Sequence, residues 1–283
     1  GGAHNDTLSG GDGDDTFKIE GTGQGYDRFF GGAGTDRIVG SAGNDTIGIN
    51  AVFNADNSVE EIDGGTGDNV IRGTDGNDSL DFSATTLTNI GEIQGGAGHD
   101  TIVGTSADDV IVGGAHNDTL FGGQGDDTFK VEGMGQGYDR IFGGEGTDRI
   151  VGSEGDDTIG INAVFNADNS VEEIDGGAGH DIIRGTDAND SLDFSATTLT
   201  NIDEIHGGSG HDTIIGSAGD DTIVGGAHND RLFGGAGQDT FLFDINSGMD
   251  IIGDFNAGDA LRFNGDAFSL DNLHMVQSGN NVV

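Results

Sequence analysis

The residues in this chain best suited to chemistry are aspartates that close short glycine-rich loops. A nine-residue phrase recurs, as in Gly31–Val39, Gly95–Val103 and Gly207–Ile215: two glycines, a polar loop, an aspartate and one apolar residue. Glycine permits backbone conformations that leave carbonyl oxygens pointing toward a common centre, and the aspartate adds a carboxylate. Calcium prefers such oxygens, and takes six to eight of them. One loop is too small to supply this number, whereas two stacked loops can.

We expect the sixth residue of each loop to be a metal ligand. A solvated turn also favours Asp and Gly, but so many copies in register favour ion binding. Asn69 breaks the pattern where the second copy has Asp181, so a weaker site is expected there. The candidate ligands are Asp6, Asp15, Asp27, Asp36, Asp45, Asp78, Asp100, Asp109, Asp118, Asp127, Asp139, Asp148, Asp157, Asp181, Asp190, Asp212, Asp221, Asp230 and Asp239.

The elements that position these loops are short strands, each with one inward apolar residue. The eighth position of the phrase is β-branched, aromatic or leucine, which is typical of strand interiors. Its neighbours at positions seven and nine point outward by strand alternation. A strand this short cannot fold alone, so only stacking buries its apolar residue. In the first part of the chain these residues are Leu8, Phe17, Phe29, Ile38, Ile47, Ile62, Ile71, Leu80, Ile93, Ile102 and Ile111.

A longer repeat contains the nonapeptides. GGAHND recurs at Gly1, Gly113 and Gly225, and the stretch 1–112 differs from the stretch 113–224 at 21 positions. Three degenerate copies, each preceded by a short insertion, bring the count to eleven half-turns per long repeat. Because eleven is odd, Tyr26 and Tyr138 are expected on opposite sheets. The insertions are residues 19–21, 49–54 and 82–85, and the degenerate copies are residues 22–30, 55–63 and 86–94.

The phrase G-G-x-G-x-D-x-U-x resembles the repeat of the RTX (repeats-in-toxin) family, over nearly all of residues 1–242. This resemblance implies an all-β fold, a right-handed parallel β-roll with two nonapeptides per turn. It also implies calcium ions between stacked loops, which take carbonyls from one loop and aspartates from both. We expect about a dozen ions per chain, each with six or more oxygens. Magnesium is a poorer candidate because it requires rigid octahedral geometry.

The sequence predicts one continuous solenoid with four segments. Residues 1–112 and 113–224 form two repeat units, residues 225–242 a partial third unit, and residues 243–283 a C-terminal cap. Phe243–Phe263 leaves the repeat pattern and is richer in apolar residues than the array. It also resembles the closing segment of such arrays. Because the open strands at a solenoid end must be covered, we expect this segment to be the cap. The chain begins in mid-repeat, so we interpret it as a fragment of a longer protein.

Composition disfavours several partners. The chain carries 51 acidic and 10 basic residues, a formal charge of -41, and no cysteine or proline. Such a charge disfavours binding to nucleic acid and to anionic membranes, and no apolar run is long enough to span a bilayer. Self-repulsion and 57 glycines oppose a compact state without cations. The metal-free chain is therefore expected to be disordered or nearly so.

Weaker signals receive structural explanations. The fourth-position glycine is replaced by His4, His116 and His228. Because these residues are 112 residues apart, they cannot share one ion. The exposed fifth position is occupied by His99, His180 and His211. Without an H-E-x-x-H pattern, a zinc site is disfavoured. Outward threonines suit strands, and arginines at the seventh position interrupt any flat ice-binding face. The arginines are expected to pair locally with Glu or Asp rather than to bind an anionic polysaccharide.

We predict a calcium-binding structural module of a secreted bacterial protein, one that folds when it meets extracellular calcium and is not itself an enzyme. By resemblance, export follows the type I secretion route. A monomeric rod without membrane insertion is expected. Two alternatives stay open: a carbohydrate-binding or adhesive stalk at a cell surface, and a C-terminal scaffold for a protease, lipase or epimerase domain outside this sequence.

Overall fold

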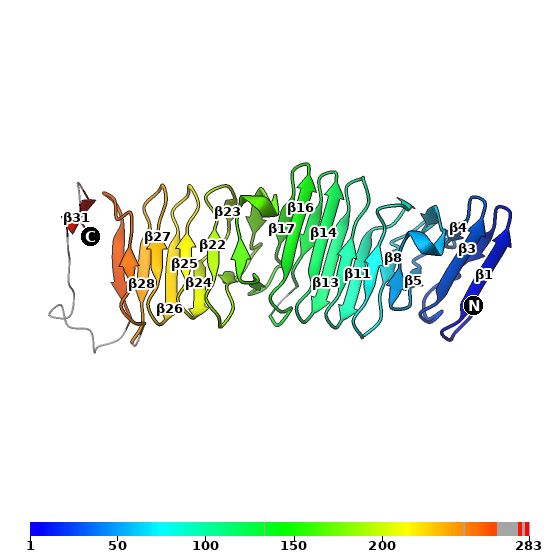
Figure 1. Cartoon of the computed structure of the whole chain (residues 1–283), viewed down its shortest axis with the longest axis horizontal. Helices are drawn as coiled ribbons and strands as arrows, with labels where there is room; N and C mark the ends of the chain where they lie inside the picture. The colour runs from blue at the N-terminus through cyan, green and yellow to red at the C-terminus, as the bar shows by residue number, and fades with distance from the viewer. Residues whose placement is uncertain (133, 246, 265–276, 279–280, 283) are drawn as a thin grey trace. The chain divides into compact units, whose positions relative to one another are not determined.

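The computed structural model describes residues 1–132, 134–245, 247–264, 277–278 and 281–282. The chain separates into two compact units, residues 1–131 with 135–149, and residues 132–134 with 150–283. Both units are built from parallel strands that stack turn upon turn, as Figure 1 shows within each unit. The fold is the predicted all-β parallel solenoid of nonapeptide repeats.

The first unit contains four sets of parallel strands. The first pairs β1 (Thr7–Asp12) with β3 (Arg28–Ala33). The second contains β2 (Thr16–Lys18), β4 (Arg37–Val39), β7 (Glu61–Asp63) and β10 (Thr86–Thr88). The third contains β5 (Thr46–Gly48), β8 (Val70–Arg72), β11 (Glu92–Ala97), β13 (Val110–Ala115) and β15 (Thr128–Lys130). The fourth contains β6 (Val52–Phe53), β9 (Ser79–Asp81), β12 (Thr101–Val103), β14 (Thr119–Gln124) and β16 (Arg140–Glu145).

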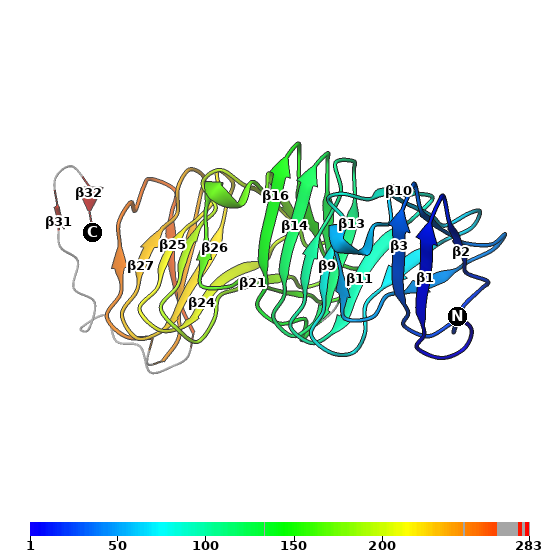
Figure 2. The same ribbon diagram turned by 45° about the vertical axis from the view of Figure 1, so that its right-hand side comes forward.

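The second unit repeats this plan, with β25 beside β27 and β24 beside β26 (Figure 2). One set contains β18 (Thr158–Gly160), β21 (Ile182–Arg184), β24 (Glu204–Ser209), β26 (Thr222–Ala227), β28 (Thr240–Phe243) and β30 (Ala260–Phe263). Another contains β19 (Val164–Phe165), β22 (Ser191–Asp193), β25 (Thr213–Ile215), β27 (Arg231–Phe233) and β29 (Ile251–Ile252). The remaining strands are β17 (Arg149–Val151), β20 (Glu173–Asp175), β23 (Thr198–Thr200), β31 (Gln277–Ser278) and β32 (Asn281–Val282).

The core of each unit is the column of eighth-position residues. Ile93 lies beside Ile111 and Ile111 beside Phe129, and all three are almost fully buried. Burying one such side chain contributes about 1.5–3 kcal/mol, so stacking rather than any single strand stabilises the fold. The regular steps of this column confirm the expected two nonapeptides per turn in this part of the chain.

Elsewhere the expectation of two strands per turn is wrong. Between Ile38 and its partner Ile62, one turn away, lie both β5 and β6, so this turn has three strands. The third strand comes from the insertion at residues 49–54, whose Phe53 is buried and packs on Phe82 with ring centroids 5.1 Å apart. A third side forms because the insertion brings its own core residue.

A short 3-10 helix turns the chain after β6 and after its counterpart β19. The helix η1 (Ala55–Asn57) is capped by Asn54, which accepts from the Asp56 N–H, while the Asn57 side chain accepts from the Asn54 N–H. The buried Asn57 amide also donates to the Phe29 carbonyl of the preceding turn. The second unit repeats this arrangement at η2 (Ala167–Asn169).

The predicted count of eleven half-turns is therefore wrong, since thirteen strands, β1 to β13, form between Thr7 and Ala115. The extra strands are β6 and β10, both in segments that the repeat pattern assigns to an insertion or a degenerate copy. With three-strand turns, an odd or even number of nonapeptides no longer decides the side on which a residue lies.

The expected placement of Tyr26 and Tyr138 on opposite sheets fails for this reason. The strands that follow them are β3 and β16. A parallel bridge joins Asp27, just before β3, to Ile49 in the next turn. The Ser79 N–H of β9 donates to the Ala51 carbonyl, so β9 continues the side that contains β3. The same sheet continues from β9 to β16. Both tyrosines thus precede strands on one side of the first unit.

Part of the predicted cap continues the solenoid. Strand β29 pairs with β27, and β30 pairs with β28, so residues 251–263 add strands to the stack. Residues 265–276, 279–280 and 283 lie outside the described residues. The capping role of residues 243–283 and the four-segment division stay predictions.

Candidate metal centre

The sixth-position aspartates stand one above another along the stack. In at least eleven of the nineteen, the backbone N–H donates to the Oδ1 of the aspartate one turn ahead, at 2.8 Å from Asp100 to Asp118 and 2.8 Å from Asp109 to Asp127. The same bond joins Asp212 to Asp230 at 2.9 Å in the second unit. Each carboxylate is thereby fixed in direction. Further pairs are Asp6–Asp27, Asp15–Asp36, Asp78–Asp100, Asp118–Asp139, Asp127–Asp148, Asp157–Asp181, Asp190–Asp212 and Asp221–Asp239.

These carboxylates are buried, against the alternative of solvated turn residues. Of the nineteen candidates, all except Asp6 and Asp15 are buried. In at least ten, the second oxygen, Oδ2, is buried and has no hydrogen-bond partner among the described residues. A buried polar oxygen without a partner costs about 1–3 kcal/mol, and a charged one costs more. The ten are Asp15, Asp36, Asp100, Asp118, Asp127, Asp181, Asp190, Asp212, Asp230 and Asp239.

A backbone carbonyl lies beside such an Oδ2 atom. A Cβ atom placed on Gly122 would meet both the Asp127 Oδ2 and, at 2.6 Å, the carbonyl oxygen of Gly143 one turn ahead. A Cβ atom on Gly185 would likewise meet the Asp190 Oδ2 and the Gly207 carbonyl, each at 2.6 Å. Two acceptors therefore lie close together beside the glycine Cα atom. Such a pair of oxygens suits a hard cation, and a side chain on the first glycine would collide with both of them.

The donor set points to oxygen-preferring metals. Among the described residues, no group of three or more His, Asp or Glu side chains converges on one point. A site in these loops must therefore draw carbonyl oxygens as well as the carboxylates of two turns. Calcium accepts this combination of ligands, whereas zinc sites use histidine and cysteine.

Burial raises the pKa of these carboxyls. The pKa rises to about 7 for Asp118, Asp127 and Asp212 and to about 8 for Asp139, in each case mainly because burial removes water from the charged form. Neighbouring aspartates on the next turns raise the pKa of Asp127 further. The site therefore needs a positive partner at neutral pH, whether a proton or a metal ion.

The loops fall into two classes that were not expected from the sequence. Where the second residue is Ser or Thr, it donates to the aspartate itself: Asp109 Oδ2 accepts from the Thr105 N–H at 2.6 Å and from the Thr105 hydroxyl at 2.9 Å. Such a loop satisfies its own carboxylate. In the sequence, the residue that follows the first glycine of a loop distinguishes the two classes. This class comprises Ser41 with Asp45, Thr74 with Asp78, Thr105 with Asp109, Ser153 with Asp157 and Ser217 with Asp221. Thr186 is an exception, because its hydroxyl donates to Oδ1 of Asp190, whose Oδ2 has no hydrogen-bond partner among the described residues.

Asn69 shows what fills the space when the carboxylate is absent. Its side-chain N–H donates to the Asn89 carbonyl at 3.0 Å. In the second unit Asp181 replaces Asn69, and a Cβ atom on Gly176 would meet both the Asp181 Oδ2, at 2.8 Å, and the Asn201 carbonyl. An amide donor thus occupies the place where Asp181 leaves two oxygens facing each other.

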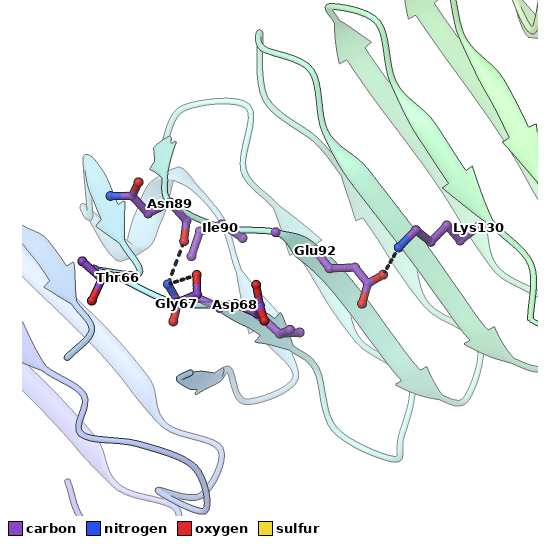
Figure 3. A pocket seen from close by; sticks show the side chains of 11 residues that line it. Thr66, Gly67, Asp68, Asn89, Ile90, Glu92 and Lys130 are labelled. Atoms are coloured by element: carbon purple, nitrogen blue, oxygen red, sulfur yellow. Dashed lines mark hydrogen bonds and ion pairs between the residues drawn. The ribbon is translucent and has the colours of Figure 1, made fainter. Parts of the chain in front are cut away.

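The surroundings of Asn69 differ from those of Asp181 in a second way. A pocket of about 510 Å³ opens beside Asn69 and is lined by Glu92 and Lys130, whose charged groups pair at 2.8 Å (Figure 3). Asp203, which accepts the Asp181 N–H at 2.9 Å, is replaced by Gly91 in the first unit. This loop of the first unit therefore has two fewer carboxylates than its equivalent.

Four further carboxylates belong to the same ladder although the repeat pattern did not indicate them. Asp36 N–H donates to Glu60 at 2.7 Å, and Asp230 N–H donates to Asp250 at 2.9 Å. Asp239 N–H donates to Asp259 at 3.1 Å. Asp203, described above, is the fourth. The loop segments that end in these four residues lack the Gly-Gly pair of the repeat, so a search for the glycine-rich phrase passes over them.

The outward arginines bond to neighbours on the solenoid surface. The Arg37 Nε donates to Thr16 at 3.2 Å and the Arg149 Nε to Thr128 at 3.1 Å. Arg72 lies 3.8 Å from Asp75 at a solvent-exposed position. Arg72 therefore pairs with an acidic residue as expected, whereas Arg37 and Arg149 bond to threonine hydroxyls instead. Exposed ion pairs contribute about 0–1 kcal/mol.

Comparison with known families fits this geometry. A model of the RTX calcium-binding nonapeptide repeat matches residues 1–17, 22–47, 55–84, 94–129, 135–159, 167–196 and 206–241. The chain belongs to the RTX calcium-binding repeat family. RTX repeats bind calcium, and the role of their β-roll is structural rather than catalytic. The charged loops of this RTX chain are thus part of a calcium-binding array.

No curated protein matches the RTX chain. Among solved structures, the chain is similar to the extracellular lipase LipA from Serratia marcescens, with 15% identity over 77% of this chain and 41% of the lipase, and a TM-score of 0.21. The RTX chain thus spans about two fifths of the length of that protein. In the described residues, no helix is long and apolar enough to cross a membrane.

Proposed function

We propose that this RTX chain is a structural module in which calcium ions bind between stacked turns and hold the fold together. The observation that carries the proposal is the set of buried Oδ2 atoms that have no hydrogen-bond partner within the described part of the chain. A calcium ion beside them supplies the positive charge that both the carboxylate and the adjacent carbonyl need. The Asn69 amide, which donates to the equivalent carbonyl, supports this interpretation from the opposite direction.

The nineteen sixth-position aspartates are the proposed ligand set, with the glycine-glycine loops as the main ion sites. The Ser and Thr loops close on themselves through hydrogen bonds and depend less on the metal. Asn69 replaces a ligand by a donor, so the space between Asn69 and Asn89 holds no ion. About a dozen ions, each taking six or more oxygens, would use most of the aspartates and loop carbonyls of the array as ligands.

Binding and folding are proposed to be one event. The chain carries a net charge of -41, so the metal-free state repels itself. Ions that bind only the folded state stabilise it, and each added site increases this stabilisation. Calcium in the millimolar range outside a cell saturates extracellular modules of this type, whereas the cytosol does not. We therefore propose a secreted bacterial protein whose repeat array stays unfolded until export and performs no catalysis itself.

The two alternative functions receive no specific support. The arginines that would bind an anionic polysaccharide donate to threonines of their own sheet, as with Arg37 and Thr16. A scaffold role for an adjoining catalytic domain concerns residues outside this chain. Both are compatible with calcium-dependent folding, so the experiment addresses that property first.

The test is a calcium titration of the metal-free chain followed by far-UV circular dichroism. The proposal predicts a disordered spectrum in excess chelator and a cooperative gain of β-structure as calcium rises to millimolar levels. Magnesium at the same concentration should fail to produce it. A β-rich spectrum that persists in chelator would overturn the proposal.

A further inference from the structure

Two pairs of histidines lie side by side on the surface of the loops, one pair in each unit. The rings of His99 and His116 have centroids 5.7 Å apart, and those of His211 and His228 are 5.8 Å apart. All four side chains are exposed. The two histidines of a pair are 17 residues apart, one fewer than the 18 residues of a two-nonapeptide turn. The fifth position of one loop therefore meets the fourth position of the loop in the next turn.

The first histidine of each pair has a fixed tautomer. The His99 Nδ1 lies 2.9 Å from the Asn117 carbonyl oxygen, and because a carbonyl only accepts, Nδ1 carries the proton. The His211 Nδ1 makes the same contact with the Asn229 carbonyl at 3.0 Å, shorter than its 3.3 Å contact with the Asn229 N–H. In the neutral ring, Nε2 is then the nitrogen available to a metal ion. This is the arrangement in which backbone carbonyls orient metal-binding histidines.

The second histidine of each pair occupies a costly backbone conformation. His116 has φ 80° and His228 has φ 82°, in the left-handed region, at the loop position that the repeat gives to glycine. Both places carry a histidine despite this cost. A ring at that position lies beside the oriented ring of the neighbouring turn.

We propose that each histidine pair binds one divalent transition-metal ion, separate from the calcium sites. Two imidazoles on one tetrahedral zinc ion, with Zn–N bonds of about 2.0–2.1 Å, hold their ring centroids roughly 5–5.5 Å apart. The observed separations lie close to this range, and rotation of exposed rings closes the difference. Water completes the coordination. Imidazole nitrogen suits zinc, nickel and copper, whereas the carboxylate and carbonyl loops suit calcium, so the two kinds of site select different metals.

His180 provides a matched control. It lies at the same exposed fifth position of its loop, and its backbone N–H donates to the Asp156 side chain of the preceding turn at 2.9 Å. The Asp181 N–H donates to Asp203, so Asp203 stands where Asp118 stands relative to His99. His116 lies two residues before Asp118, and the residue two before Asp203 is Asn201. His180 therefore has the same loop position without a second imidazole at that place. A zinc ion that merely associates with any exposed histidine would respond to His180 as well.

The experiment is an isothermal titration of zinc chloride into the chain with calcium already saturating. Two zinc ions per chain are expected. His99→Ala should remove one, His211→Ala the other, and the double variant both, whereas His180→Ala should retain two. His116→Gly restores the glycine of the repeat, so it should fold with calcium at least as well as the parent chain and still lose one zinc ion. Circular dichroism confirms calcium-dependent folding of each variant.

Two results would overturn the inference. One is zinc uptake that stays at two ions in the double variant. The other is no zinc uptake by the folded parent chain. Because calcium is saturating and folding is measured separately, failure of the zinc sites is distinguishable from failure of the calcium proposal.

Discussion

Replacing Asp127 by Asn isolates the role of one buried carboxylate oxygen. Asp127 is fully buried, its Oδ1 accepts the Asp109 N–H at 2.8 Å, and its Oδ2 has no hydrogen-bond partner in the described chain. The amide keeps the Oδ1 acceptor and the side-chain volume but replaces Oδ2 by a donor and removes the charge. In chelator, the variant should fold no worse than the parent, because burial raises the pKa of Asp127 to about 7 and its charge opposes folding there.

In saturating calcium the same variant should be clearly less stable. An ion present at 100 times its dissociation constant contributes about 2.7 kcal/mol to the folded state. For a chain of roughly 150–250 residues, 1 kcal/mol corresponds to about 2–4 °C in Tm, so loss of one site should lower Tm by roughly 5–10 °C. Thermal unfolding followed by circular dichroism in millimolar calcium measures this loss, and the far-UV spectra of both chains in chelator compare their metal-free states.

Asp126→Asn is the matched control for Asp127→Asn. It makes the same change of charge one residue away, at an exposed position, and its Oδ1 keeps the bond from the Thr147 N–H at 2.8 Å. Exposed substitutions of this kind change stability by about 0.5 kcal/mol or less, so Tm should move by only about 1–2 °C. Equal losses of Tm in the two variants, or an unchanged calcium response in Asp127→Asn, would refute the reasoning.

Three further predictions follow from the same loops. Gly114→Ala should abolish calcium-induced folding of the first unit, because φ is +105° and the new Cβ would collide with the Gly96 carbonyl, whereas Gly76→Ala, which meets only an ordinary contact at 3.7 Å, should be tolerated in the same dichroism assay. Thr105→Val should cost about 1–3 kcal/mol in chemical unfolding by leaving its aspartate partner without the hydroxyl donor, whereas Thr105→Ser should be nearly neutral. Acid should partly replace calcium: burial raises the pKa of Asp139 to about 8, so the metal-free fold is most stable below pH about 4 and loses stability as pH rises toward 8. A metal-free chain with less β-structure at pH 4 than at pH 8 would contradict this.

The loops are well predicted from the sequence because their spacing is local. Asp100 and Asp118 are separated by two nonapeptides, and an uninterrupted two-strand turn places them in direct register, as the bond between them shows. The buried column at Ile93, Ile111 and Phe129 follows from the same period. Here pattern and structure agree because no insertion intervenes.

The extra strands could not be predicted from the repeat. Strand β6 has only two residues, and its Phe53 lies in an insertion without the glycine-aspartate pattern. Its strand character comes from packing on Phe82 and pairing with β9, which are contacts with the next turn of the solenoid. Tertiary packing rather than local pattern decides that segment.

The two classes of loop and the histidine pairs were missed for different reasons. Thr105 occupies a position that the repeat gives to glycine, and the aspartate of a loop does not distinguish the two classes. His99 and His116 lie at different positions of their nonapeptides, so the repeat pattern does not pair them. They come into contact only once the turns are stacked in the observed register.

The calcium-dependent fold is tested most directly beside the buried Oδ2 atoms. Crystals grown in calcium, measured at a wavelength where calcium scatters anomalously, locate the ions without reference to any variant. We predict anomalous peaks within about 2.3–2.6 Å of the Oδ2 atoms of Asp100, Asp118 and Asp127, and none between Asn69 and Asn89. Calcium-saturated crystals in which those carboxylates are buried without an adjacent peak would contradict it.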